Sequence, residues 1–235
     1  MDYINRLALR CQNNRIAKLL LSPFWHMYLK YKWNVRNRKF RRYAPELLRK
    51  VNGCLQPEGI TFWLDFGTLL GVYREHDFLK HDLDIDCGAF VDDLRAIEQI
   101  LKKSGFKLLS QSYVEGEDTI IEQTYIYKEV TIDFFYYSQV GNNIVCHSFS
   151  VTDGVVSEGR EIVSVKRIEL PYSGFKSIDF IDEIFLIPAN VEEYLMANYG
   201  DSFMTPNPHF DYKKEAKNIV YYTLDEKVGY RLTYK

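Results

Sequence analysis

The sequence predicts a mixed α/β domain preceded by a basic helical segment, and three observations lead to this prediction. Apolar residues recur at helical spacing in the first part of the chain, whereas the chain beyond residue 105 alternates as strands do. Hydrophobic residues form 46% of the 235 residues, enough to bury the core of one domain. Finally, the charge is divided unevenly along the chain, which separates an N-terminal extension from the rest.

The basic residues are concentrated at the N-terminus. Residues 1–50 carry 13 Lys or Arg and two acidic residues, a net charge of +11, while the remainder carries 17 basic and 30 acidic residues, a net charge of -13. Such a division indicates a basic segment that meets an anionic partner, joined to an acidic body. We therefore expect a basic helical extension over residues 1–55, which is a candidate for membrane association, and a catalytic domain over residues 56–235.

Two helices are expected in this extension. The apolar spacing of residues 3–21 predicts the first, and we expect Pro23 to interrupt or restart it. The second is expected from Pro45 to Leu55. The longest early apolar stretch, residues 19–29, is shorter than the roughly 20 residues that a membrane span needs, so we expect no transmembrane helix.

Aromatic residues lie among the cations of this extension. Trp25, Tyr28, Tyr31 and Trp33 surround Lys30, a mixture typical of helices that lie in the membrane interface. Two other interpretations stay open: a helix packed on the body with a solvated basic face and, less favoured, nucleic-acid binding, because a basic run alone does not select its anion. We expect contact with an anionic membrane and no nucleic-acid partner.

The cysteines indicate a reducing compartment. Cys11, Cys54, Cys87 and Cys146 lie far apart, without a C-x-x-C pair and without a secretory signal before them. Together with the basic extension, this predicts a cytoplasmic protein at the inner face of the cytoplasmic membrane.

The second part of the chain alternates strands and helices. A strand is predicted over residues 60–64, a short helix over 69–74, a strand over 83–87 and a helix capped by Asp92 or Asp93 that ends near Gly105. Further strands are predicted over 106–111, 120–127, 130–137, 144–149, 162–170 and 175–180. A last helix is expected from Asn190, as N-cap, to Gly200.

The stretch from Thr61 to Gly88 carries the predicted chemistry. Gly67 allows a close backbone approach, and the helix that begins at Thr68 offers N–H groups and a hydroxyl to a phosphate. Asp84 and Asp86 are one residue apart, so on a strand both point from the same face. Adjacent carboxylates repel unless a cation lies between them, and oxygen ligands favour Mg2+ or Mn2+.

A third carboxylate is expected from a neighbouring strand. Asp133 lies in the apolar run 131–135, where burying it without a metal or a partner would be costly. A phosphate-binding turn with three convergent carboxylates is the equipment of metal-dependent phosphoryl or nucleotidyl transfer. Each feature alone has an ordinary explanation, such as a solvated D-x-D turn, and it is their order and spacing that favour a site.

Two blocks of the sequence resemble a known family. The block WLDFGTLLGVYR, followed by HDLDID, is similar to the signature of the LicD family, which includes bacterial phosphocholine transferases, fukutin and the fukutin-related protein. A second block, IPANVEEYL with YGD and MTP after it, is similar to the C-terminal pattern of that family. Together they frame residues 58–206. The resemblance implies a nucleotidyltransferase-type mixed sheet with flanking helices, so that residues 56–235 would form a nucleotidyltransferase-fold catalytic domain.

The resemblance also implies an activity: transfer of a phospho-alcohol from a CDP- or CMP-linked donor to a sugar hydroxyl of a cell-surface glycan, with release of CMP. A lipid-linked glycan is one candidate acceptor. In such an enzyme Asp84 and Asp86 would bind Mg2+ or Mn2+, and Asp133 would complete the site and orient or deprotonate the acceptor. Choline, ethanolamine, aminoethylphosphonate, glycerol and ribitol all remain open as headgroups.

The remaining predicted site residues surround these carboxylates. By the resemblance, Gly67 and Thr68 would hold donor phosphate and Arg74 would neutralise more of it. Asp65 and Asp82 are matched positions expected to support the site.

This chain departs from the family pattern before the acidic motif. Many members have Pro and Trp, followed by a run of acidic residues, where this chain has Lys80 and His81. These two residues are candidates for contact with a donor headgroup or phosphate, although a solvated loop position is the ordinary interpretation of His81. Cys87 is expected to be a small buried residue and not a nucleophile.

Two other functions remain open on the sequence alone. The same fold could transfer a nucleoside monophosphate to a protein or small molecule with release of pyrophosphate. A non-catalytic scaffold is disfavoured, because an inactive module has little reason to hold three mutually repelling acids together.

Overall fold

The computed structural model describes residues 15–116, 120–157, 160–207, 210, 216 and 218–234. The chain forms two compact units, Met1–Lys39 and Phe40–Lys235. The first belongs to the basic extension, and the helix predicted over residues 3–21 lies partly outside the described residues. The second contains the sheet and every predicted site residue.

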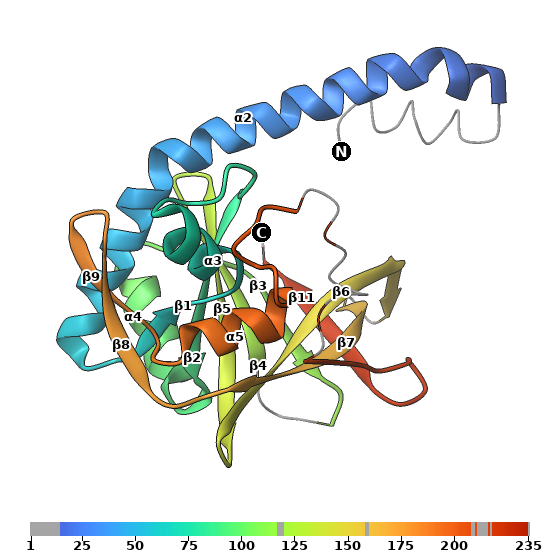
Figure 1. The fold of residues 1–235 in the computed structure, drawn as a ribbon. Coiled ribbons are helices and arrows are strands. Elements are labelled where there is room, and N and C mark those ends of the chain that lie inside the picture. The colour runs from blue at the N-terminus through green and yellow to red at the C-terminus, as the bar shows by residue number, and fades with distance from the viewer. Residues whose placement is uncertain are drawn as a thin grey trace. The chain divides into compact units, whose positions relative to one another are not determined.

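A single helix, α2 (Arg15–Leu55), runs through the whole described part of the extension (Figure 1). The predictions that Pro23 interrupts this helix and that a separate helix begins at Pro45 were therefore wrong. A proline removes one backbone hydrogen bond, and Leu, Lys and Arg neighbours with good helix propensity can sustain the helix around it. Among the described helices, none has an apolar stretch long enough to cross a membrane.

The last part of α2 belongs to the core of the second unit. Six apolar residues of this part are buried at helical spacing: Phe40, Ala44, Leu47, Leu48, Val51 and Leu55. This buried face holds the helix in place although Pro45 lies within it. The basic extension predicted for residues 1–55 thus contributes its final 16 residues to the sheet unit.

The second unit contains three further α-helices and eleven strands among its described residues. The helical segments after α2 are η1 (Gln56–Glu58), α3 (Phe66–Glu75), η2 (Val91–Asp93), α4 (Leu94–Lys103) and α5 (Val191–Tyr199). The strands are β1 (Phe62–Leu64), β2 (Asp84–Phe90), β3 (Lys107–Val114), β4 (Ile120–Tyr127), β5 (Val130–Val140), β6 (Asn143–Ser157), β7 (Arg160–Pro171), β8 (Phe175–Phe180), β9 (Glu183–Pro188), β10 (Ile219–Tyr221) and β11 (Val228–Thr233).

The strands form one large mixed sheet and a small hairpin. The large sheet runs β1-β2-β5-β4-β3-β11-β7-β10, and β6 pairs with both β5 and β7. The pairings of β3, β4, β5, β6, β7 and β11 therefore close into a ring. β2 is parallel to β5 and β1 is antiparallel to β2, while β8 and β9 form the hairpin. This mixed sheet confirms the predicted fold class.

Most predicted elements are found, with shifted ends, whereas the last strands were missed. All six strands predicted from residue 106 onward are present, but β9, β10 and β11 were not predicted. The predicted N-cap positions are confirmed, Asp93 for α4 and Asn190 for α5, although neither side chain makes a capping hydrogen bond. The Asn190 amide donates instead to the Pro171 carbonyl at 3.1 Å.

The core beside β1 is built around Trp63. This fully buried ring contacts Phe90, Tyr137 and Phe175, with centroid distances of 5.3, 5.2 and 4.9 Å. Gly88 is the partner of Trp63 across the β1–β2 pair. A Cβ atom at Gly88 would lie 2.2 Å from the Trp63 ring, so only glycine leaves room for the indole.

We expect Gly88→Ala to destabilise the protein by about 3 kcal/mol or more, because rigid overpacking forces both the indole and the strand to move. Gly53→Ala is the matched control, since Gly53 lies in α2 and nothing lies within 4 Å of its added Cβ. This control is expected to stabilise the helix by roughly 0.5–1 kcal/mol. Urea denaturation of both variants measures the difference, and equal midpoints would contradict the packing argument.

Candidate functional site

The predicted carboxylates lie together on two adjacent strands. Asp84 and Asp86 share one face of β2, while Ile85 and Cys87 are buried on the opposite face. β2 and β5 are parallel, and their register places Asp133 directly beside Asp86. The fold thus brings Asp133 beside Asp84 and Asp86, from which it is separated by 47 residues or more in the sequence.

The Gly-Thr turn lies against these carboxylates at the start of α3. The Gly67 N–H donates to Oδ2 of Asp86 at 3.1 Å, and a Cβ at Gly67 would lie 3.6 Å from Oδ1 of Asp82. The buried Thr68 hydroxyl accepts the backbone N–H of Asp86 at 2.9 Å. In this arrangement the hydroxyl of Thr68 fastens the turn to β2, and the α3 N-terminus faces an anion, namely the Asp86 carboxylate.

Asp65 holds the start of this turn in place. It is fully buried, and its carboxylate accepts hydrogen bonds from the Phe66 N–H at 2.8 Å, the Tyr137 hydroxyl at 2.6 Å and the Tyr194 hydroxyl at 2.9 Å. Burial raises the pKa of Asp65 to about 6, although all three donors lower it. Asp65 therefore links α3, β5 and α5, which agrees with the supporting role predicted for it.

Burial and mutual repulsion disfavour the ionised acids. Burial raises the pKa of Asp86 well above its ordinary value, and the charges of Asp84 and Asp133 raise it further. Burial also raises the pKa of Asp133 to about 8, with an added contribution from Glu122 and an opposing hydrogen bond from Thr124. Without a cation, this face of the sheet therefore holds protons at neutral pH.

Asp82 joins the same group of acids from the loop before β2. Burial, followed by the charge of Asp84, raises the pKa of Asp82 to about 7. The neighbouring Lys80 and His81 are exposed, and only His81 lines a pocket beside α3. The structure thus separates these two residues, although they are adjacent in the sequence.

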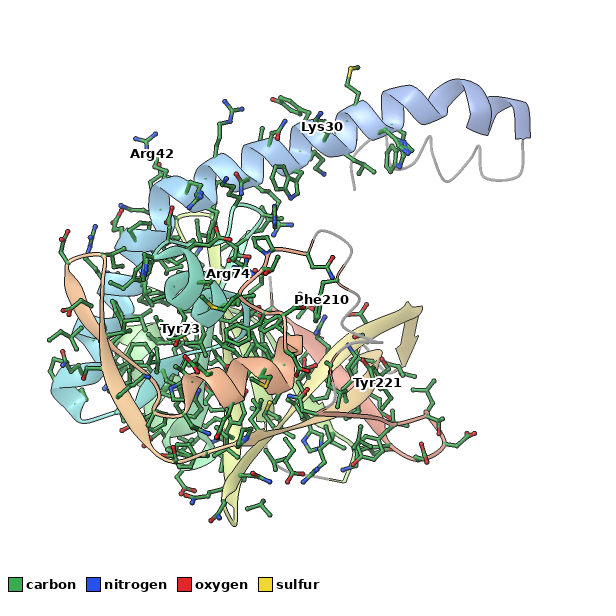
Figure 2. The ribbon with its side chains drawn as sticks, in the orientation of Figure 1. Lys30, Arg42, Tyr73, Arg74, Phe210 and Tyr221 are labelled. Atoms are coloured by element: carbon green, nitrogen blue, oxygen red, sulfur yellow. The ribbon has the colours of Figure 1, made fainter. Side chains whose placement is uncertain are left out.

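Arg74 lies near the end of α3 and is held by its surroundings. It donates to the Phe203 carbonyl at 2.9 Å and to Glu75 at 2.9 Å. Its Nε atom is buried and has no hydrogen-bond partner among the described residues. Arg74, which is labelled in Figure 2, lines the same pocket as His81, so two of the predicted substrate contacts lie in one pocket.

The structure also reveals a buried pair that the sequence did not indicate. Glu122 on β4 and Arg231 on β11 form an ion pair of 3.2 Å, and Arg231 donates to Ser112 on β3 as well. The charges of both members act on the pKa of Asp133. A long-range pair of this kind has no local signature, because its register depends on β11, a strand that was not predicted.

The donor set fits a divalent cation. Within the described residues, no three His, Cys, Asp or Glu side chains are already gathered into a closed set of metal ligands. Nevertheless, Oδ1 of Asp133 is buried and has no hydrogen-bond partner among the described residues, and Asp86 lies beside it in register. Oxygen ligands that must otherwise be protonated are suited to Mg2+ or Mn2+, which can replace those protons.

Cys87 is buried, as expected, and burial raises the pKa of its thiol well above the ordinary value. The thiolate that a nucleophile requires is therefore disfavoured. The three cysteines that the structure describes, Cys54, Cys87 and Cys146, are all free thiols.

A mixed sheet with acids on two parallel neighbouring strands, beside a Gly-Thr helix start, defines the class of nucleotidyltransferase domains. Residues 59–189 match the family described as LicD/FKTN/FKRP, nucleotidyltransferase domain, and the chain belongs to this family. The predicted family is thereby confirmed, and the matched residues contain the first sequence block and only the start of the second.

Several relatives are similar over most of this chain. Human "Ribitol-5-phosphate transferase FKTN" is 25% identical over 182 residues, which cover 77% of this chain and 37% of that protein. Human "Ribitol 5-phosphate transferase FKRP" is 25% identical over 174 residues, 69% of this chain and 33% of that protein. "Uncharacterized protein T07A5.1" of Caenorhabditis elegans is 29% identical over 189 residues, 75% of this chain and 47% of that protein.

This chain therefore spans less than half the length of these curated relatives. Among solved structures, a lincosamide antibiotic adenylyltransferase LnuA with bound lincomycin is similar at a TM-score of 0.39 and 14% identity, covering 60% of this chain and 78% of that one.

The raised pKa of Asp133 predicts a pH-dependent stability in the metal-free protein. Because its pKa rises from 3.8 to about 8 on folding, the proton on Asp133 contributes stability that is fully present below pH 3.8 and is lost as the pH rises through about 8. In EDTA, we expect the melting temperature of Asp133→Asn to fall less than that of the wild type between pH 6 and 8.5. Asp179→Asn, an exposed change on β8, is the control and should follow the wild type. Parallel curves for Asp133→Asn and wild type would contradict the assigned environment.

Proposed function

We propose that this protein is a metal-dependent transferase that moves a phospho-alcohol from a CDP- or CMP-linked donor to a sugar hydroxyl of a glycan and releases CMP. The observation that carries the proposal is the placement of Asp84, Asp86 and Asp133 side by side at the Gly67 turn. Membership in a family that contains proteins named as ribitol-5-phosphate transferases supports the class of group transferred.

In the proposed reaction, the oxygen of the acceptor hydroxyl forms a bond to the donor phosphorus that carries the alcohol. The bond from that phosphorus to the bridging oxygen breaks, and CMP leaves with the electron pair. A cation bound at Asp84 and Asp86 would favour the ionised form of Asp133, and the Asp133 carboxylate would then accept the proton of the acceptor hydroxyl. Asp84 and Asp86 would hold Mg2+ or Mn2+, which neutralises phosphate charge when bound.

The remaining residues position this reaction. The N–H groups of the α3 first turn face the anionic side of the site, and Asp65 holds that turn through Tyr137 and Tyr194. Beyond the effect of burial, the charge of Glu122 raises the pKa of Asp133 and the charge of Arg231 lowers it, so this pair tunes the acid.

We expect Asp84→Asn and Asp86→Asn to lower the turnover number by about 100-fold or more while the fold is retained, because each change removes a metal-binding charge without changing volume. Metal-dependent CMP release from a panel of CDP- and CMP-linked donors, with a labelled phospho-alcohol, measures this. Asp179→Asn is the matched control. Full activity in both variants would refute the site. Pyrophosphate release with labelled nucleotide on the acceptor would instead support the alternative, transfer of a nucleoside monophosphate.

We further propose that the extension binds an anionic membrane surface, which would bring the enzyme to a lipid-linked acceptor. Residues 25–39 contain five Lys or Arg and no acidic residue, and Lys30 is labelled in Figure 2. Met27, Leu29 and Tyr31 are 65%, 46% and 63% exposed. Exposed apolar side chains among cations suit the interface of an anionic membrane.

We expect a full-length variant with Lys30→Glu, Lys32→Glu and Arg36→Glu to lose binding to vesicles that contain phosphatidylserine. Each cation near such a surface contributes about 1 kcal/mol, so removing three weakens binding by roughly 100-fold or more. The control carries Lys103→Glu, Lys107→Glu and Lys176→Glu in the sheet unit. Sedimentation with anionic and with purely zwitterionic vesicles measures the difference, and equal partition of both variants would refute membrane binding.

A further inference from the structure

A pocket of about 460 Å³ lies beside α3 and is separate from the carboxylates. It is lined by Leu70 and Arg74 of α3, by Leu79 and His81 of the following loop, and by the segment after α5 that contains Phe203 and Phe210. We propose that this pocket binds the cytosine base of the donor nucleotide. The proposal rests on the function proposed above and names a place for one part of its donor.

The lining of the pocket suits a flat ring with polar edges. Tyr199 and Phe210 lie 5.6 Å apart between ring centroids, and Phe203 adds a third aromatic ring. Aromatic faces stack on nucleobases irrespective of sequence. The Asn207 amide and the Thr205 hydroxyl, which also line the pocket, offer hydrogen bonds to the edge of a base. A polyol such as ribitol would instead need polar groups all around it.

The charge of the pocket lining favours a neutral base over a cationic headgroup. The lining residues that can carry a positive charge are Arg74 and His81, and none of the described lining residues is Asp or Glu. The Arg74 guanidinium pairs with Glu75 at 2.9 Å, and none of the described lining residues offers a carboxylate to a cationic headgroup such as choline or ethanolamine. A neutral base needs no such partner, because the polar groups of the lining can pair with its edge.

The position of the pocket agrees with this assignment. Leu70 and Arg74 follow Gly67 by three and seven residues, so they lie about 4.5 and 10.5 Å farther along the axis of α3. His81 precedes Asp82, whose carboxylate lies beside the Gly67 turn. A donor with its phosphates at the turn would therefore extend its base along α3 into the pocket. The ribose and the first phosphate would then span the distance between the Gly67 turn and the pocket.

Two substitutions that each introduce a tryptophan test the pocket. Ser202 and Met204 are both exposed and lie two residues apart, but only Ser202 lines the pocket. We expect Ser202→Trp to fill the pocket and to raise the Kd of CMP at least tenfold, and Met204→Trp to change it less than twofold. Isothermal titration with CMP, in the wild type and both variants of the full chain, gives these values. Phe203→Leu removes one ring, retains the carbonyl that Arg74 contacts and is expected to raise the KM of the donor more than it lowers kcat.

The outcomes separate this inference from the proposed transfer. Asp84→Asn is expected to lose transfer yet to bind CMP, and adding Ser202→Trp to this variant is expected to block that binding. If the wild type binds CMP in this pocket but transfers no phospho-alcohol, the base site stands and the proposed function fails. If the wild type transfers the group while Ser202→Trp binds CMP as tightly as Met204→Trp, the base site is overturned. If Ser202→Trp raised the KM of the glycan and left the KM of the donor unchanged, the pocket would belong to the acceptor and the base site would be overturned as well.

Discussion

The constraint on which this structure depends is the crowding of carboxylates on one face of two parallel strands. Asp86 and Asp133 are register partners, and Asp84 and Asp82 are close enough to raise the pKa of Asp86. Such a group is unfavourable unless it binds protons or a cation. Neighbouring parts of the fold are arranged around this requirement, because the α3 N-terminus faces Asp86 while Arg231 reaches the same region through Glu122.

The crowded face also explains why the turn beside it is so firmly held. If the turn moved, the Asp86 carboxylate would lose the Gly67 N–H, and its backbone N–H would lose the Thr68 hydroxyl. Asp65 opposes such a movement of the turn, because the Tyr137 and Tyr194 hydroxyls fix its carboxylate to β5 and to α5. The three donors offset part of the cost of burying this acid, and the loss of any one of them would leave more of that cost uncompensated. The same hydrogen bonds therefore serve stability and preorganisation.

The local part of this arrangement could be predicted from the sequence, and the long-range part could not. The period-2 spacing of Asp84 and Asp86 and the Gly67 turn are local signals, and so is an acid in the apolar run around Asp133. By contrast, the Glu122–Arg231 pair requires the register of β11, which has only a short and weakly patterned sequence. The continuity of α2 through Pro45 was missed for a related reason: the buried face that sustains it becomes visible only against the sheet.

In the function that we propose, the reacting groups and the donor-binding pocket lie on different kinds of structure. The acids and the turn lie on a strand pair and a helix start, where regular hydrogen bonding fixes their geometry. The pocket beside α3 takes much of its lining from the irregular segment after α5 and from the loop that contains His81. Loops tolerate changes that a paired strand cannot, because a loop substitution need not disturb a register. The departure of this chain from its family at Lys80 and His81 lies in such a loop, and His81 lines the pocket. If the pocket holds the donor base as we propose, a change in this loop would alter which donor is accepted while the carboxylates remain in place.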